Sequence, residues 1–323
     1  MRILVTGCTG FIGSNVVNAL LDQGHEVVGV DNLNHAYDVR LKKWRLEELT
    51  NNVRFHFHEL DITESSHVEE VVAQSAFDGL INLAARAGVR QSLQIPGEYY
   101  KTNVLGTLNL LEACRNHGIT KFIQASTSSV YGNTAPPFDE KFKADGPLSP
   151  YAASKKSAEN LCYVYHHVYG IDVSVVRYFT VFGPAGRPDM AVYRFIRWIT
   201  ESEPITVYGD GTQARDFTYV SDIAEGTIAA LKHLGFEVIN LGADRPTSVI
   251  DLIEILEGLI DKKAIIRNNP ANKLDVDKTW ASIDKAKYLL GWQPKVDLEM
   301  GLNASVRWYL DHRDWAKDIN LGV

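Results

Sequence analysis

The chain has 323 residues, of which 45% are hydrophobic and 23% are charged. These fractions are typical of globular proteins and exclude a disordered or fibrous chain. The 40 Asp and Glu residues outnumber the 33 Lys and Arg residues, and the net charge of −7 excludes the overall basic character of many nucleic-acid-binding proteins.

The first half alternates short apolar runs with stretches of helical pattern. The runs are apolar on nearly every residue, which is typical of parallel strands covered on both faces. Strands are predicted at 3–5, 27–30, 53–55, 79–83, 122–125 and 173–176, and helices at 12–23, 64–75, 98–117 and 150–168. This order predicts an α/β fold with a Rossmann-like, doubly wound parallel sheet.

After Arg177 the rhythm changes, beginning with a loop rich in Gly and Pro at 183–188. Helices are predicted at 190–201, 222–234, 248–261 and 297–312, short strands at 205–207, 237–241 and 264–266, and a long irregular loop at 267–282. We therefore divide the chain into a sheet domain, 1–178 with about 218–245, and a smaller, mostly helical C-terminal lobe, 179–217 and 246–323. A cleft between them is the expected ligand site.

The three cysteines, Cys8, Cys114 and Cys162, are too scattered for a disulfide framework or a paired-cysteine metal site, so no metal is expected. No apolar run approaches the roughly 20 residues of a membrane-spanning helix. The N-terminus starts with a predicted strand at 2–5, without the pattern of a signal peptide. We expect a cytoplasmic protein that binds neither membrane nor nucleic acid.

Three glycines follow the first predicted strand with the spacing Gly7-x-x-Gly10-x-x-Gly13. Such glycines let a pyrophosphate approach backbone amides at the N-terminus of a helix, although a tight strand-to-helix turn alone explains them too. Asp31 ends the second strand, about 20 residues further on, where a carboxylate binds a ribose hydroxyl and disfavours a 2′-phosphate. This pattern favours NAD over NADP, with a simple turn at Asp31-Asn32 as the alternative.

A second constellation combines Thr127, at the end of a predicted strand, with Tyr151 and Lys155. Residues four apart share one face of a helix. A free tyrosine, with a pKa of about 10, is a poor base at neutral pH, but a nearby ammonium favours its phenolate. Tyr151 is then a candidate base for a hydroxyl proton, and Thr127 a hydrogen-bond partner of the reacting oxygen. Alternatively, Tyr151 and Lys155 are ordinary residues of a helix surface.

Together these motifs resemble the extended short-chain dehydrogenase/reductase superfamily, and within it the NAD-dependent nucleotide-sugar epimerases. Further matching segments are Leu83-Ala84-Ala85, Ser126 to Gly132, Gln213 to Phe217 and Leu290-Gly291-Trp292. The resemblance implies that NAD is bound by Gly7, Gly10, Phe11, Ile12, Gly13, Asp31, Asn32, Asp61, Ile62, Leu83, Ala84, Ala85, Asn103, Ser126, Tyr151, Lys155 and Tyr178. It also implies a homodimer formed by the helices at 98–117 and 150–168.

The segments Arg86 to Arg90 and Arg177 to Ala191 are similar to those of UDP-glucuronate 4-epimerases. In that group the equivalents of Thr180, Arg187, Ser128 and Ser129 hold the sugar carboxylate, which a planar cation and hydroxyls suit well. The resemblance implies that Arg86, Ala191, Val207, Tyr208, Arg215 and Asp275 also contact the UDP-sugar. Tyr151 would take the 4-hydroxyl proton, and a transient 4-keto sugar would turn over and be reduced on its other face.

Related enzymes differ at single positions. Decarboxylases of the superfamily carry Glu in place of Ser129, and 4,6-dehydratases carry Asp-Glu in place of Ser128-Ser129. A second diphosphate-binding arginine of the family, expected near Asn272, is absent, and Lys273 is a possible substitute. Two alternatives remain: a 4-epimerase of UDP-glucose or UDP-N-acetylglucosamine, and a non-catalytic NAD-binding sensor or scaffold.

Overall fold

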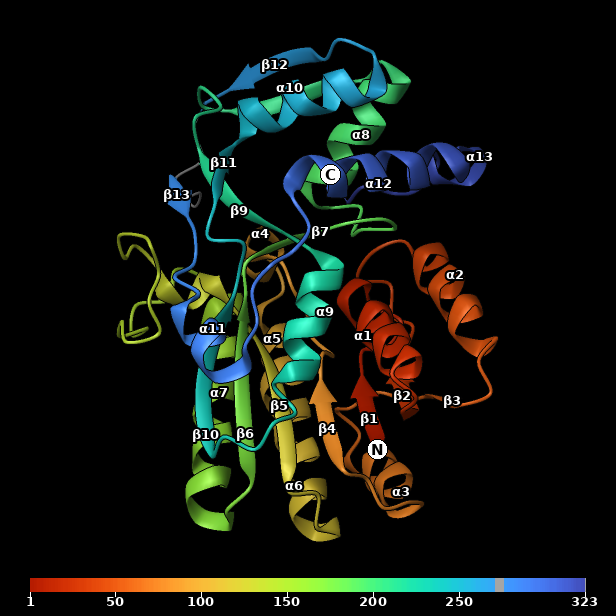
Figure 1. Cartoon of the computed structure of the whole chain (residues 1–323), viewed down its shortest axis with the longest axis vertical. Coiled ribbons are helices and arrows are strands. Elements are labelled where there is room, and N and C mark those ends of the chain that lie inside the picture. Colours follow the sequence, from red (N-terminus) through yellow and green to blue (C-terminus); the bar gives the residue numbers. More distant parts are fainter. Residues whose placement is uncertain (271–275, 323) are drawn as a thin grey trace.

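The computed structural model describes residues 1–270 and 276–322, and its largest element is a parallel sheet of seven strands (Figure 1). The strand order is β10-β6-β5-β4-β1-β2-β3. The chain leaves β1 toward β2 and β3 on one side and later builds β4 on the other, so the order reverses between β1 and β4. Ligands of such sheets bind beyond the carboxyl ends of the strands at this reversal. The strands are β1 (Arg2–Thr6), β2 (Glu26–Asp31), β3 (Phe55–Glu59), β4 (Gly79–Asn82), β5 (Lys121–Thr127), β6 (Asp172–Tyr178) and β10 (Phe236–Leu241).

Each face of this sheet is covered by its own hydrophobic core. Ile3 and Val5 of β1 belong to a core shared with helices α1 and α9, whereas Leu4 belongs to a core shared with α3, α6 and α7. Successive side chains of a strand point to opposite faces, so a strand covered on both faces is apolar at every position. The predicted doubly wound α/β fold is confirmed.

The helices of this part connect the strands or pack on them. α7 is the longest and begins with the Ser149 side chain accepting from Ala152 N, followed by Pro150 in the first turn. The helices are α1 (Phe11–Asp22), α2 (Val39–Thr50), α3 (Ser65–Ala73), α4 (Val89–Ser92), α5 (Pro96–Tyr100), a π-helix (Lys101–Leu105), α6 (Gly106–His117), a 3₁₀-helix (Ser128–Tyr131), α7 (Pro150–Tyr169), α9 (Val220–Ala229) and α11 (Asp284–Leu290). No helix among the described residues is long and apolar enough to cross a membrane.

A smaller C-terminal lobe lies beyond the carboxyl ends of the strands, at the top of Figure 1. A third hydrophobic core lies within this lobe, where α8, α10 and α12 pack around Phe217 and Ile205. The lobe consists of β7 (Thr180–Phe182), α8 (Ala191–Glu201), β8 (Pro204–Tyr208), β9 (Ala214–Tyr219), β11 (Pro246–Ser248), α10 (Val249–Ile260), β12 (Ile265–Asn269), β13 (Lys278–Thr279), α12 (Leu298–Asp311) and α13 (Arg313–Ala316).

Asp216 of β9 joins the two parts. Its buried carboxylate accepts hydrogen bonds from the backbone amides of Ala243 at 2.6 Å, Asp244 at 3.2 Å and Ala281 at 2.9 Å. Burial raises the pKa of Asp216 to about 6. The segment that follows β10 and the segment that precedes α11 are therefore both bonded to β9.

The structure differs from the predicted elements in several places. The third strand is Phe55–Glu59 rather than 53–55, and the helix predicted at 98–117 is divided by the π-helix. The loop predicted at 267–282 is wrong in part, because β12 extends to Asn269 in parallel with β8, and Lys278–Thr279 pair with β9. These short strands are stabilised by pairing with distant partners, which no local pattern shows.

Candidate active site

The glycine loop after β1 is built for a close approach of backbone. Gly7 adopts a positive φ of 66°, and a Cβ there would lie 2.7 Å from the Ala84 amide nitrogen. A Cβ at Gly13 would lie 2.0 Å from the Gly7 carbonyl oxygen. Gly10 precedes Phe11 and Ile12, the first residues of α1, without a side chain to cap the helix. The first amides of α1 thus have no side-chain cap, and such amides at a helix N-terminus are typical partners of an anion.

The carboxyl ends of β2 and β3 bring acidic and amide side chains beside this loop. Asp31 accepts from the Thr9 amide at 3.3 Å and from Lys42 Nζ at 3.3 Å, both as buried contacts. Asn32 Nδ2 donates to Asp61 Oδ2 at 2.8 Å. Burial raises the pKa of Asp61, but hydrogen bonds from Thr63 and Asn32 outweigh it and leave that pKa below its ordinary value. No sequence pattern predicts the contact between Lys42 and Asp31.

The segment after β4 closes the other side of the loop. Leu83 N and Ala84 N bond to Thr6, at 3.2 and 3.1 Å, and Ala85 follows them. Asn103 of the π-helix accepts from Arg86 N at 2.8 Å and donates to Arg86 O at 2.9 Å. It also donates to Ser154 of α7 at 2.9 Å. The Asn103 side chain therefore connects the β4 loop to α7, while Ile62 packs against Gly106 in the next helix.

Tyr151 and Lys155 both face the end of β5 from α7. The Tyr151 hydroxyl interacts with the Thr127 hydroxyl, and Lys155 Nζ donates to the Ala125 carbonyl at 2.9 Å. Thr127 Oγ1 in turn accepts from the Ser129 amide at 3.2 Å, at the start of the 3₁₀-helix that carries Ser128. The structure thus brings the three predicted catalytic residues to one strand end.

Burial acts on both titrating groups of this site. It raises the pKa of Tyr151, although the Thr127 hydroxyl and the positive charge of Arg187 act in the opposite direction. Burial also lowers the pKa of Lys155 to about 8. In this structure the Lys155 ammonium is bonded to a carbonyl of β5, and Arg187 supplies positive charge that favours the Tyr151 phenolate. Sequence reasoning assigned Arg187 to the substrate alone and missed this effect.

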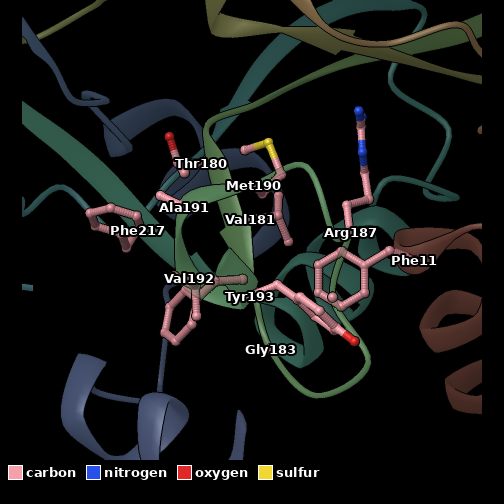
Figure 2. A pocket seen from close by; sticks show the side chains of 12 residues that line it. Phe11, Thr180, Val181, Gly183, Arg187, Met190, Ala191, Val192, Tyr193 and Phe217 are labelled. Carbon is pink, nitrogen blue, oxygen red and sulfur yellow. The ribbon is translucent and has the colours of Figure 1, made fainter. Parts of the chain in front are cut away.

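A small pocket between the two parts contains four of the predicted site residues: Phe11 of α1 with Thr180, Arg187 and Ala191 from the lobe (Figure 2). In Figure 2 the Thr180 hydroxyl and the Arg187 guanidinium point to the same side of this pocket. Two arginine nitrogens contact Asp189, Nε at 3.0 Å and Nη2 at 2.6 Å. Arg187 Nη2 also reaches the Ala87 carbonyl at 3.3 Å, so it spans from the lobe to the β4 loop.

Two predicted cofactor residues direct their hydroxyls elsewhere. Ser126 Oγ donates to Glu159 at 2.6 Å inside the domain. The Tyr178 hydroxyl bonds to Thr227 Oγ1 at 2.8 Å, and burial raises the pKa of Tyr178. Both hydroxyls thus have partners within the protein, and contacts of these residues with a cofactor stay predictions.

The predicted uridine-side residues lie on two strands of the lobe, with Val207 and Tyr208 on β8 and Arg215 on β9. Val207 is buried in the lobe core, whereas Tyr208 is half-buried with the Arg90 guanidinium 4.7 Å from its ring centroid. Arg215 Nη1 donates to the Ala214 carbonyl at 2.9 Å. Arg90 thus connects the β4 side of the cleft to Tyr208, a contact that sequence reasoning missed. Asp275, Asn272 and Lys273 lie outside the described residues.

The comparisons with known proteins agree with this geometry. Residues 3–242 match the model of the NAD dependent epimerase/dehydratase family. The chain belongs to this family. It is 54% identical over 319 residues to the UDP-glucuronate 4-epimerase of Thermodesulfobacterium geofontis, covering 98% of this chain and 99% of the relative.

Solved structures give the same result. A UDP-glucuronic acid 4-epimerase from Bacillus cereus, in complex with UDP-glucuronic acid and NAD, superposes with a TM-score of 0.90 and is 40% identical over 97% of this chain and 100% of that one. The UDP-glucose 4-epimerase of Thermotoga maritima, with UDP-glucose, has a TM-score of 0.89 and is 34% identical over the same shares.

The family name implies NAD, and the glycine loop fits it. The backbone packs so closely at Gly7 and Gly13 that only glycine fits, as in the tight strand-to-helix turns that place a pyrophosphate at a helix N-terminus. Asp31 lies beside the loop at the position of a ribose-binding carboxylate. Within residues 1–270 and 276–322, no group of three or more His, Cys, Asp and Glu side chains is arranged to hold a metal ion.

Proposed function

We propose that the chain is an NAD-dependent 4-epimerase that interconverts UDP-glucuronate and UDP-galacturonate. The observation that carries this proposal is the position of Arg187, which lines the pocket with Thr180 and whose charge acts on Tyr151. A cation beside the proton-transfer residue suits a substrate with a carboxylate on the sugar. The similarity to UDP-glucuronate 4-epimerases over nearly the whole chain supports the same substrate.

When bound, NAD supplies a reversible two-electron oxidation at the sugar C4. Gly7, Gly10 and Gly13 would let its pyrophosphate reach the α1 amides, and Asp31 would bind a ribose hydroxyl. Asn32, Asp61 and Ile62 would border the adenine. Leu83, Ala84, Ala85 and Asn103 would form the wall on the β4 side.

The proton of the 4-hydroxyl is moved by Tyr151. In this structure its phenol interacts with the Thr127 hydroxyl at the end of β5, and with substrate bound this hydroxyl would bond to the reacting sugar oxygen instead. Arg187 places positive charge near this phenol, which counters the effect of burial on its pKa. The ammonium of Lys155, one helical turn along α7, would act in the same direction. The same tyrosine returns the proton when the sugar is reduced on its opposite face.

The sugar carboxylate would be bound by Arg187, Thr180, Ser128 and Ser129. A 4-keto sugar acid loses CO₂ readily, so an epimerase needs its carboxylate held away from the geometry of decarboxylation. A planar guanidinium with neighbouring hydroxyls provides directional hydrogen bonds of the required kind. Arg86 and Ala191 would border the sugar. Tyr208 and Val207 would flank the uracil, and Arg215 and Asp275 would meet the rest of the UDP.

Assigning the two parts follows from these residues. The sheet domain, 1–178 with about 218–245, would carry NAD, and the lobe, 179–217 with 246–323, would carry the UDP-sugar. Within the second range α11 is an exception, because it packs against β10 and α9 of the sheet domain. Cys8, Cys114 and Cys162 are buried free thiols, which supports a reducing compartment and a cytoplasmic location.

A homodimer is also part of the proposal. The second half of α7 exposes Val164 and Val168, with 48% and 59% of their surfaces accessible, and these residues share one helix face. Tyr100 and Leu105, which are 44% and 43% accessible, lie on the segment that packs beside α7. Such exposed apolar surface is typical of an interface with a second copy.

A substrate panel tests the proposed function. Purified protein is incubated separately with UDP-glucuronate, UDP-glucose and UDP-N-acetylglucosamine, and the products are resolved by chromatography. We expect the highest kcat/KM with UDP-glucuronate and release of NAD when the protein is denatured. Preferred turnover of a neutral UDP-hexose would favour that alternative, and NAD binding without any turnover would favour a sensor.

A further inference from the structure

Three side chains of α7 at four-residue spacing face successive positions at the end of β5. Tyr151 interacts with Thr127, Lys155 Nζ donates to the Ala125 carbonyl at 2.9 Å, and Glu159 Oε1 accepts from Ser126 Oγ at 2.6 Å. Residues four apart lie on one helix face, so this row fixes both the rotation of α7 and its position along β5. The first two members are catalytic in the proposed function, and the third has no role there.

Besides its contact with β5, Glu159 forms a buried ion pair with Arg177 of β6. Arg177, near the end of β6, donates Nε to Oε1 at 2.8 Å and Nη2 to Oε2 at 2.7 Å. The two side chains are only 2% and 3% accessible. The Tyr131 ring covers the guanidinium at 4.7 Å, and Tyr131 bonds to Asn240. Burying such a pair costs so much desolvation that an apolar pair is often as stable, so its presence points to a role other than stability.

We propose that Glu159, clamped by Arg177 and Ser126, is a positioning residue that holds Lys155 at the base of the sugar site and stabilises its ammonium form. This inference rests on the proposed function, because it assumes that Lys155 acts as a cation. Glu159 lies one helical turn beyond Lys155, on the side away from Tyr151. It therefore acts through the lysine and through the register of α7, and touches neither cofactor nor substrate.

The groups around Lys155 support this assignment. Burial lowers the pKa of Lys155 to about 8, and the groups that act against burial are Cys162 and Glu159, both on α7. Burial raises the pKa of the Cys162 thiol, so this thiol is neutral at pH 7, and Glu159 supplies the negative charge. From β5, the Ala125 carbonyl accepts from Lys155, and Arg177 of β6 donates to Glu159. Lys156 contacts Glu159 from the outer side, at 3.2 Å.

The test is the pH dependence of kcat for Glu159→Gln in the NAD-loaded enzyme. Glutamine keeps the size and a hydrogen bond to Ser126 but removes the charge. The Lys155 proton is then lost more easily, so the alkaline decline of kcat is expected to shift to lower pH by about one unit. KM for UDP-glucuronate is expected to stay within about twofold, because Glu159 does not contact the substrate.

Two further variants separate charge from stability. The double variant Glu159→Gln with Arg177→Gln leaves no buried guanidinium unpaired, so it folds where the single variant fails. The same shift in the alkaline decline of kcat is expected for it. The control is Asp172→Asn, which breaks the buried Lys121–Asp172 ion pair of 2.5 Å. This pair lies where β5 and β6 begin, at the ends of the strands away from the site. Asp172→Asn lowers thermal stability without shifting the pH profile. An unshifted profile in the folded double variant would overturn the proposal.

A readout that needs no substrate distinguishes this inference from the proposed function. Tyrosinate absorbance is titrated in the wild type and in each Glu159 variant, and the corresponding Tyr151→Phe titration is subtracted. In the proposed function the Lys155 ammonium favours the Tyr151 phenolate, so loss of the Glu159 charge, which makes this ammonium easier to deprotonate, is expected to move the difference titration to higher pH. If no UDP-sugar is turned over but the titration moves, the proposed function fails and the Glu159 role stands. An unmoved titration contradicts the Glu159 role even where turnover is normal.

Discussion

Arg187 and Asp189, two residues apart in the loop before α8, form a bidentate ion pair with distances of 3.0 and 2.6 Å. The pair fixes the plane of the guanidinium while its Nη2 reaches the Ala87 carbonyl on the other side of the cleft. A sugar carboxylate would therefore meet a cation that is already oriented, which lowers the entropy lost on binding.

Arg187→Ala is expected to weaken binding of UDP-glucuronate selectively. A hydrogen bond between charged groups contributes roughly 1.5–3 kcal/mol, so KM for UDP-glucuronate should rise about 10- to 100-fold. Any turnover of UDP-glucose, which has no carboxylate, should show a much smaller change in KM. Steady-state kinetics with both substrates measure the difference.

Arg197→Ala is the matched control, because Arg197 lies on α8 and its Nη1 donates to the Ile319 carbonyl instead of lining the pocket. It should leave both KM values unchanged. If Arg187→Ala raised the KM for the acidic sugar and the KM for the neutral sugar by the same factor, Arg187 would not recognise the carboxylate.

Gly13→Ala should prevent formation of the cofactor loop. The new Cβ would lie 2.0 Å from the Gly7 carbonyl oxygen and 3.1 Å from the Cys8 Cα, which are backbone atoms that cannot rotate away. We expect loss of bound NAD and a lower free energy of unfolding. Gly97→Ala is the control, since a Cβ there meets nothing within 4 Å, and its stability should be equal or higher by up to about 1 kcal/mol. Normal NAD content in Gly13→Ala would contradict the assignment of the loop.

Lys155→Met should make the protein more stable at neutral pH while abolishing turnover. Burial lowers the pKa of Lys155 to about 8 from 10.5, so the folded chain binds this proton more weakly than the unfolded chain does. The charged lysine therefore costs stability below pH 8, by about 3 kcal/mol at most, and the cost disappears as pH rises toward 10.5. The variant also loses the hydrogen bond to Ala125, so we expect a net gain of about 1–2 kcal/mol at pH 7.

Denaturant unfolding of wild type and Lys155→Met at pH 7 and at pH 10 measures this gain, which should be smaller at pH 10. Lys121→Met provides the comparison, because it removes a buried lysine whose partner Asp172 would be left without its cation. That variant should be less stable than wild type. If Lys155→Met were less stable than the wild type by the same amount at both pH values, burial of the charged lysine would carry no cost in stability.

The sequence predicted the doubly wound sheet because its strands are apolar on every residue, as in Ile3-Leu4-Val5, and this signal is local. The constellation of Thr127, Tyr151 and Lys155 was predicted as well, since a strand terminus and a helical spacing of four are also local features. The glycine loop was predictable for the same reason. Each of these features is encoded within one segment of the chain.

Contacts between distant segments were not predictable. Lys42 pairs with Asp31, Arg90 covers Tyr208 and Arg177 clamps Glu159, and nothing in the spacing of these residues indicates their partners. The hydrogen bond from Ser126 to Glu159 also joins distant segments, and the predicted contact of Ser126 with the cofactor stays a prediction. The strand at Lys278–Thr279 exists only through its pairing with β9.

Charged substitutions on the exposed apolar face of α7 should dissociate the proposed dimer. Val164→Glu combined with Val168→Glu places two charges on this face, and burying them in an interface is unfavourable. We expect a monomer in light scattering coupled to size-exclusion chromatography. Tyr288→Glu, on α11 where the tyrosine is 87% accessible, should keep the wild-type mass. A wild-type protein that is already monomeric would contradict the proposed interface.

The most direct test of the account follows the hydrogen at C4 of the sugar. UDP-glucuronate carrying deuterium at C4 is incubated with the enzyme in ordinary water, and the UDP-galacturonate formed is analysed by mass spectrometry and NMR. Removal and return of this hydrogen within one closed site predict that the product retains the deuterium at C4, and that Tyr151→Phe forms almost none of it. Product that has exchanged its C4 hydrogen with water, or full activity of Tyr151→Phe, would contradict the mechanism.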